Sequence, residues 1–82
     1  MNLIEMTEYL VKQLCTNPDG VTVKEFPSEN ENEVVIEVLV DEEDLGRVIG
    51  KEGRNANAIR TLVQASSALH DNKYVKIDID KF

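Results

Sequence analysis

Hydrophobic residues recur along the chain with two different periods, and each period predicts a type of element. Near the start, Asn2 is followed three residues later by Glu5, which is the pattern of a capping box at a helix N-terminus. Apolar residues then recur at helical spacing, so we expect a helix that runs to about Cys15. Its apolar face would consist of Leu3, Ile4, Met6, Leu10, Val11 and Leu14.

Two strands are expected next, because apolar and polar residues alternate in runs that turn residues separate. The first run covers residues 21–26, the polar segment 28–32 suits a hairpin loop, and the second run covers residues 33–40. Val35 and Leu39 lie on the second face of that run, where a partner surface and partial cover by neighbouring elements are both open interpretations. The first face is predicted to be core and consists of Val34, Ile36, Val38 and Val40.

The second half of the chain predicts two helices and a last strand. The acidic residues 41–44 suit the start of a short helix that ends at Val48, and a longer helix begins at Gly53 or Arg54. Apolar residues alternate again over 74–80, which indicates a strand. The inward stripe of the longer helix would be Ala56, Ile59, Leu62, Val63, Ser66 and Leu69.

This order of elements predicts a single α+β domain over residues 1–82. Three helices would cover one face of a mixed three-stranded sheet, in the order α-β-β-α-α-β. The first two strands would form an antiparallel hairpin. If the last strand adjoins the second, the two-helix connection would make that pair parallel.

The junction between the two later helices carries the candidate chemistry. Gly50 and Gly53 can adopt positive φ and have no Cβ, so another chain could approach the backbone closely. Lys51 and Arg54 add positive charge beside a helix N-terminus, which suits phosphate oxygens. The spacing matches neither the nucleoside-triphosphate loop nor the dinucleotide-binding loop. A sugar-phosphate backbone is therefore the natural candidate ligand.

The charge distribution modifies this picture. The net charge of −7 argues against a nucleic-acid ligand, because basic patches usually supply the electrostatic attraction. However, residues 1–45 contain twelve acids and two bases, whereas residues 46–82 contain seven bases and four acids. Positive charge is therefore concentrated near the glycine junction, at Arg47, Lys51, Arg54 and Arg60.

Other classes of function find little support in the sequence. One histidine, His70, and one cysteine at an apolar helical position provide no nucleophile, base and orienting group in a cluster, so no enzyme is expected. The acids at 41–44 lack the spacing of a calcium loop, and no metal or cofactor is expected. No apolar stretch is long enough for a bilayer, and a cytoplasmic protein without membrane or small-molecule partners is expected.

The string from Ile49 to Arg54, Ile-Gly-Lys-Glu-Gly-Arg, resembles the Gly-x-x-Gly loop of KH domains. The order of elements resembles the type II form of that fold over nearly the whole chain. Small bacterial proteins of the KhpA type, which consist of one KH domain, are similar in size as well. The resemblance implies binding of single-stranded RNA, self-association, pairing with a second KH-type RNA-binding protein, and a role in the control of cell growth and envelope synthesis.

The resemblance also implies a set of site residues. Gly50, Lys51, Glu52 and Gly53 would clamp the RNA backbone, and Arg54 and Asn55 would begin the helix behind the clamp. Bases would face an apolar groove with Ile49, Ile59 and side chains near Val38 as candidates, although both isoleucines also suit a core. Arg47 and Arg60 could reach phosphates or base edges, or could simply be solvated. The alternative is a protein-interaction adaptor that keeps the KH scaffold and has little affinity for RNA.

Overall fold

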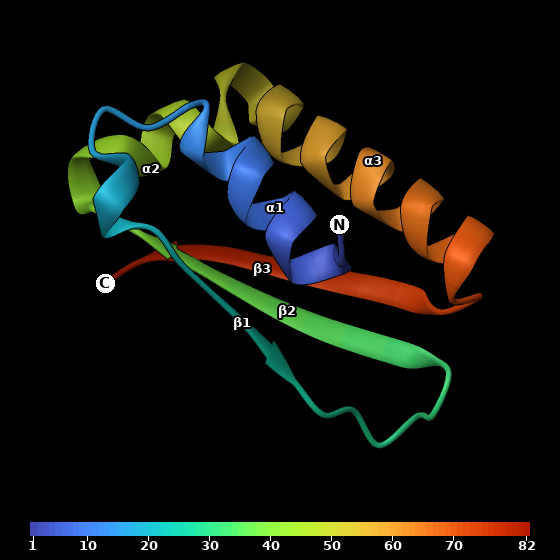
Figure 1. The fold of residues 1–82 in the computed structure, drawn as a ribbon. Coiled ribbons are helices and arrows are strands. Elements are labelled where there is room, and N and C mark those ends of the chain that lie inside the picture. Colours follow the sequence, from blue (N-terminus) through green and yellow to red (C-terminus); the bar gives the residue numbers. More distant parts are fainter.

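The computed structural model describes residues Met1–Phe82 and consists of a helical layer on a sheet (Figure 1). All three helices lie on one face of the sheet, and its other face is open. The fold is therefore the expected α+β arrangement of a type II KH domain. The elements are α1 (Leu3–Lys12), a 3₁₀ turn (Pro18–Gly20), β1 (Thr22–Phe26), β2 (Glu33–Val40), α2 (Glu42–Ile49), a 3₁₀ turn (Lys51–Gly53), α3 (Arg54–His70) and β3 (Tyr74–Lys81).

The sheet has the order β1-β2-β3, with β2 in the centre. β1 pairs with β2 in antiparallel register, and β2 pairs with β3 in parallel register, as the element order predicted. The predicted core face of β2 is confirmed, because all four of its valine and isoleucine side chains are buried. Val35 and Leu39 are half-buried on the open face of the sheet. No helix has both the length and the apolar character that crossing a membrane requires.

Helix α1 begins with the predicted capping box, in which the Asn2 side chain accepts from the Glu5 N–H and the Glu5 carboxylate accepts from the Asn2 N–H. The helix ends at Lys12, three residues earlier than expected. Residues 13–15 instead form tighter turns, with the Cys15 N–H bonded to the Lys12 carbonyl at 3.4 Å. Burial of the thiol, followed by the negative charges of nearby aspartates, raises the pKa of Cys15.

The four acids at residues 41–44 do not all serve the N-terminus of α2, which corrects the expectation from sequence. Asp41 occupies the N-cap position, but Asp44 is fully buried. Its carboxylate accepts from the Thr16 hydroxyl at 2.7 Å and from the backbone N–H groups of Thr16 and Asn17 at 2.9 and 3.0 Å. These hydrogen bonds hold the pKa of Asp44 below its usual value and outweigh the opposing effect of burial. Asp44 thus fastens the chain after α1 to helix α2.

The inner face of α3 also differs from the predicted stripe. Ala56, Ile59 and Val63 are buried as expected, but Leu62 is 50% exposed and Leu69 is 81% exposed. The buried row continues through Ser67 instead, whose hydroxyl donates to the Lys73 carbonyl at 2.8 Å. The hydroxyl thereby satisfies its hydrogen-bonding capacity in the interior and connects the end of α3 to the turn before β3.

Candidate nucleic-acid interface

The α2–α3 junction has a backbone that requires glycine. Gly50 has φ 77° and ψ 172°, a region that almost only glycine adopts. Gly53 is left-handed, with φ 76° and ψ 13°, and Glu52 between them is also left-handed, with φ 57°. The predicted positive φ of both glycines is confirmed. Three positive φ values within four residues turn the chain sharply, so that only residues 50–53 separate the end of α2 from the start of α3.

The two glycines differ in the space around them. A Cβ on Gly50 would lie 2.9 Å from the backbone nitrogen of Asn55 and 2.7 Å from its Cγ, so a side chain does not fit there. The Asn55 amide also donates to the Arg47 carbonyl at 2.8 Å and thereby joins the first turn of α3 to the last turn of α2. A Cβ on Gly53 would meet nothing closer than 4.0 Å. Gly50 is therefore needed for packing inside the junction, whereas Gly53 faces open space.

Charge at the junction is exposed. Lys51 and Arg54 are both exposed, and no side chain caps the N-terminus of α3. Arg54 pairs with Glu52 at 3.6 Å, and both side chains are about 70% exposed, so this ion pair is weak. Arg47, in the last turn of α2, is exposed too. An anion at this junction would meet the exposed cations Lys51 and Arg54 and the positive end of a 17-residue helix.

The structure separates the two isoleucines that sequence analysis placed beside the loop. Ile59 is 4% exposed and belongs to the hydrophobic core, as does Val38, which is fully buried. Of the two roles that the sequence left open for Ile59, groove lining or core, the structure shows the core role, because Ile59 lies beneath the surface. Ile49, at the end of α2, is half-buried and partly accessible.

Arg60 lies on the side of α3 that faces the edge strand β3, where its Nε donates to the Ile77 carbonyl at 3.3 Å. One turn further along, the Gln64 amide donates to the Lys73 carbonyl and accepts from the Val75 N–H, at 3.0 and 2.9 Å. The space between α3 and β3 forms a shallow hollow of about 440 Å³. It is lined by Arg60, Thr61, Gln64, Ala65, Tyr74 and Val75.

Sequence reasoning did not single out Gln64 or Tyr74 for this region. Gln64 is a polar residue in the middle of a helix, and Tyr74 is the first residue of a strand, so neither position carries a recognisable pattern. Only the packing of α3 against β3 brings them together. No group of three or more His, Cys, Asp or Glu side chains is arranged so that it could hold a metal ion.

Comparison with known proteins agrees with the geometry. The family model described as KhpA/KhpB, KH domain matches residues 4–79. Proteins named RNA-binding protein KhpA are 45% identical in Caldanaerobacter subterraneus subsp. tengcongensis and 43% identical in Clostridium perfringens, over 92% of this chain and 96% of each relative. The protein of that name from Chlamydia trachomatis is 41% identical over 92% of both chains.

Solved structures share the fold at low identity. A variant of Era from Aquifex aeolicus, bound to GDP.AlF4−, superposes with a TM-score of 0.72 at 23% identity, over 98% of this chain and 30% of that chain. Era in complex with MgGDPNP and a segment of 16S ribosomal RNA gives a TM-score of 0.68 at 24% identity, over 96% of this chain and 29% of that chain. At this level of identity the likeness concerns the fold alone. The matches to the family model and to the full-length relatives show that this chain belongs to the KhpA/KhpB KH-domain family.

Proposed function

We propose that the chain binds single-stranded RNA without catalysis and clamps the phosphate backbone at Gly50, Lys51, Glu52 and Gly53. The observation that carries this proposal is the backbone of the junction: Gly50 and Gly53 both have positive φ just before the uncapped N-terminus of α3, and the adjacent Lys51 and Arg54 are exposed. This arrangement allows close approach and supplies positive charge at the same point. The names of the relatives, RNA-binding protein KhpA, support the same ligand.

The bases of the bound strand lie in the hollow between α3 and β3. Ile49 supplies apolar surface near the clamp, and Ile59 supports the groove from the core beneath it. Asn55 keeps the two helices in register through its bond to the Arg47 carbonyl. Arg47 and Arg60 are exposed on the two sides of the junction and contact phosphates or base edges.

The protein acts as a homodimer, since a module that holds about four nucleotides binds weakly and gains apparent affinity from duplication. An exposed apolar stripe on α3 supports self-association. It consists of Ala58, Leu62, Ala65 and Leu69, at spacings of four, three and four residues. Leu62 and Leu69 lie on a different side of the helix from Arg60 and Gln64, and Ala65 is shared between the stripe and the groove.

The proposal extends to a second KH-type RNA-binding protein as partner and to cytoplasmic, post-transcriptional control of cell growth, cell shape and envelope synthesis. The role as an RNA chaperone belongs to the same proposal. Support comes from the resemblance to single-domain KH proteins and from membership of the KhpA/KhpB family.

The test compares two substitutions at one position. Gly53→Asp and Gly53→Asn add side chains of the same size, both residue types tolerate left-handed backbone, and a Cβ at this position has room. Only the aspartate adds negative charge at the clamp. Binding of a short fluorescent single-stranded RNA is followed by anisotropy.

We expect Gly53→Asn to retain more affinity than Gly53→Asp, while circular dichroism shows that both variants are folded. If the wild type and both variants bind RNA equally, the clamp is not at this loop. If the wild type does not bind RNA at all, the protein-interaction adaptor becomes the better account.

A further inference from the structure

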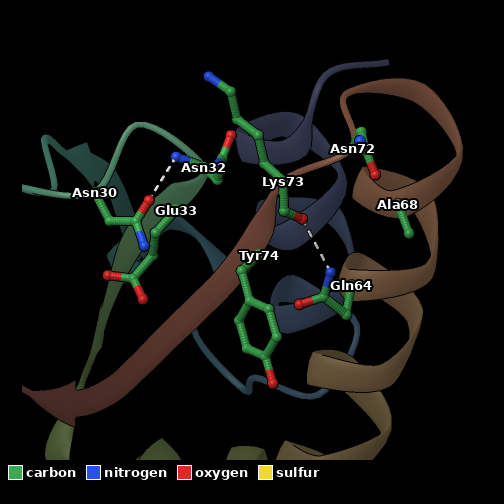
Figure 2. Close-up of a pocket in the computed structure, with 8 residues that line it drawn as sticks. All are labelled: Asn30, Asn32, Glu33, Gln64, Ala68, Asn72, Lys73 and Tyr74. Atoms are coloured by element: carbon green, nitrogen blue, oxygen red, sulfur yellow. Dashed lines mark hydrogen bonds between the residues drawn. The ribbon is translucent and has the colours of Figure 1, made fainter.

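The largest hollow of the molecule lies at the far end of α3 from the clamp, and nothing in the proposed clamp uses it. It measures about 660 Å³, within the range of sites that hold small organic groups. Its walls come from the β1–β2 hairpin, the C-terminal half of α3, and the turn into β3 (Figure 2). The residues that line it are Asn30, Asn32, Glu33, Gln64, Ala68, Asn72, Lys73 and Tyr74.

This hollow continues the groove in which the proposed RNA bases lie. Gln64 and Tyr74 line both the groove between α3 and β3 and the hollow. Gln64 lies ten residues beyond Arg54, so the hollow begins about 15 Å along α3 from the clamp. A strand that leaves the groove in this direction therefore enters the hollow.

The chemistry of the walls suits a base better than a phosphate. Four of the eight residues carry neutral amides, and the single positive charge of Lys73 is offset by Glu33. Backbone atoms of Asn32 and Asn72 make the hydrogen bonds that hold this end of the fold: the Asn32 carbonyl accepts from the Tyr74 N–H, and the Asn72 N–H donates to the Ser67 carbonyl, both at 2.7 Å. Both residues are exposed, and both line the hollow.

Tyr74 provides the aromatic surface. Its side chain is 72% exposed, and Figure 2 shows the ring projecting from the start of β3 beside Gln64. Unstacked RNA bases are commonly held by stacking on an aromatic ring together with hydrogen bonds to their edges. A side-chain amide has one donor and one acceptor group, which matches the paired donor and acceptor on an edge of adenine.

We propose that this hollow is a second base-binding site, in which Tyr74 stacks on a base of the same RNA strand beyond the nucleotides at the clamp. The amides of Asn32 and Asn72 hydrogen-bond the edge of that base, and adenine fits their donors and acceptors. This inference rests on the proposed RNA binding and deepens it. With this second site, one protomer contacts more nucleotides of the RNA than the KH clamp alone would.

The test uses two oligoadenylates, one of about four nucleotides and one of about eight, the shorter matching what a KH module holds. The variant Tyr74→Val removes the ring but keeps a good strand-forming residue at an exposed position. Tyr9→Leu is the matched control, because Tyr9 is also exposed but lies on α1, outside the hollow. We expect Tyr74→Val to weaken the longer RNA roughly five-fold or more, as loss of one stacked base does. The shorter RNA should lose less affinity than the longer one, because Tyr74 also lines the end of the groove between α3 and β3, and Tyr9→Leu should change neither affinity.

Nuclear magnetic resonance supplies a readout that a purely structural role of Tyr74 would not change. The chain has two tyrosines, so Tyr9 serves as an internal reference for the ring signals of Tyr74. The longer RNA should shift the ring signals of Tyr74 upfield and leave those of Tyr9 in place. If neither ring moves and Tyr74→Val binds both RNAs like the wild type, while Gly53→Asp still loses binding, the hollow proposal is wrong and the clamp remains. If the wild type binds neither RNA, both proposals are overturned.

Discussion

The two glycines of the clamp should respond very differently to alanine, although they look equivalent in the sequence. The backbone of Gly50, with φ 77° and ψ 172°, is in a region that costs any other residue about 1–3 kcal/mol. The added Cβ would also lie 2.9 Å from the Asn55 backbone nitrogen, so Asn55 must move. Loss of its hydrogen bond to Arg47 adds about 1 kcal/mol. Gly50→Ala should therefore cost about 2–4 kcal/mol in total.

Gly53→Ala meets only the cost of a left-handed residue, about 1–2 kcal/mol, because the nearest atom, Nδ2 of Asn57, would lie 4.0 Å from the new Cβ, at ordinary contact distance. Each kcal/mol lowers the melting temperature of a domain of this size by about 4–8 °C. Since such a domain has a total stability of only about 4–12 kcal/mol, Gly50→Ala should be severely destabilised and Gly53→Ala should remain folded.

Thermal and urea unfolding, followed by circular dichroism, measures both variants. Equal melting temperatures for the two variants, or a Gly50→Ala variant as stable as the wild type, would refute the reasoning from backbone geometry. The asymmetry also determines which glycine is suitable for binding experiments. A substitution at Gly50 confounds folding with binding, whereas one at Gly53 tests the clamp itself.

Three further predictions concern other parts of the molecule. Asp44→Asn should lower the urea midpoint at neutral pH, because an amide cannot accept all three hydrogen bonds. Since the folded-state pKa of Asp44 is lowered, its stabilising effect is complete above the unfolded-state pKa of about 4, and the difference in urea midpoint between variant and wild type should narrow as the pH falls from that value toward the folded-state pKa. Glu52→Gln should tighten RNA binding in anisotropy titrations, because it removes a negative charge from the clamp and releases Arg54, and weaker binding would show that Glu52 has another role. Because Leu69 is 81% exposed in the stripe proposed for self-association, Leu69→Glu should turn the proposed dimer into a monomer in sedimentation velocity without loss of helix content, and a dimer that the substitution leaves unchanged would place the interface elsewhere.

Much of the architecture was predictable because the period of the apolar residues and the turn residues are local signals in the sequence. The alternation in residues 33–40 identified the buried face of β2, and the glycine spacing located the junction. Buried polar residues were not predictable by these signals. Asp44 is satisfied by residues 27 and 28 positions away, and Ser67 by a turn that follows its own helix, so neither partner is visible in the local pattern.

Helix α3 shows a second limit of pattern reasoning. Its apolar residues occupy two faces, and the sequence alone does not indicate which face meets the sheet. The predicted stripe therefore mixed the buried Val63 with the exposed Leu62 and Leu69. At the candidate site, charge and glycine spacing singled out the loop that is proposed as the clamp, but the hollow around Tyr74 depends on the contact between α3 and β3, which only the folded chain reveals.

The salt dependence of RNA binding tests the central claim most directly. Each phosphate contact on a single strand contributes roughly 0.7 to the slope of log affinity against log salt concentration. Lys51→Ala removes one positive charge at the clamp, and Lys24→Ala removes one from the exposed surface of β1. The account predicts that Lys51→Ala flattens the slope by about 0.7 and weakens binding, while Lys24→Ala behaves like the wild type. Identical slopes for the two variants would contradict the assignment of the phosphate backbone to this loop.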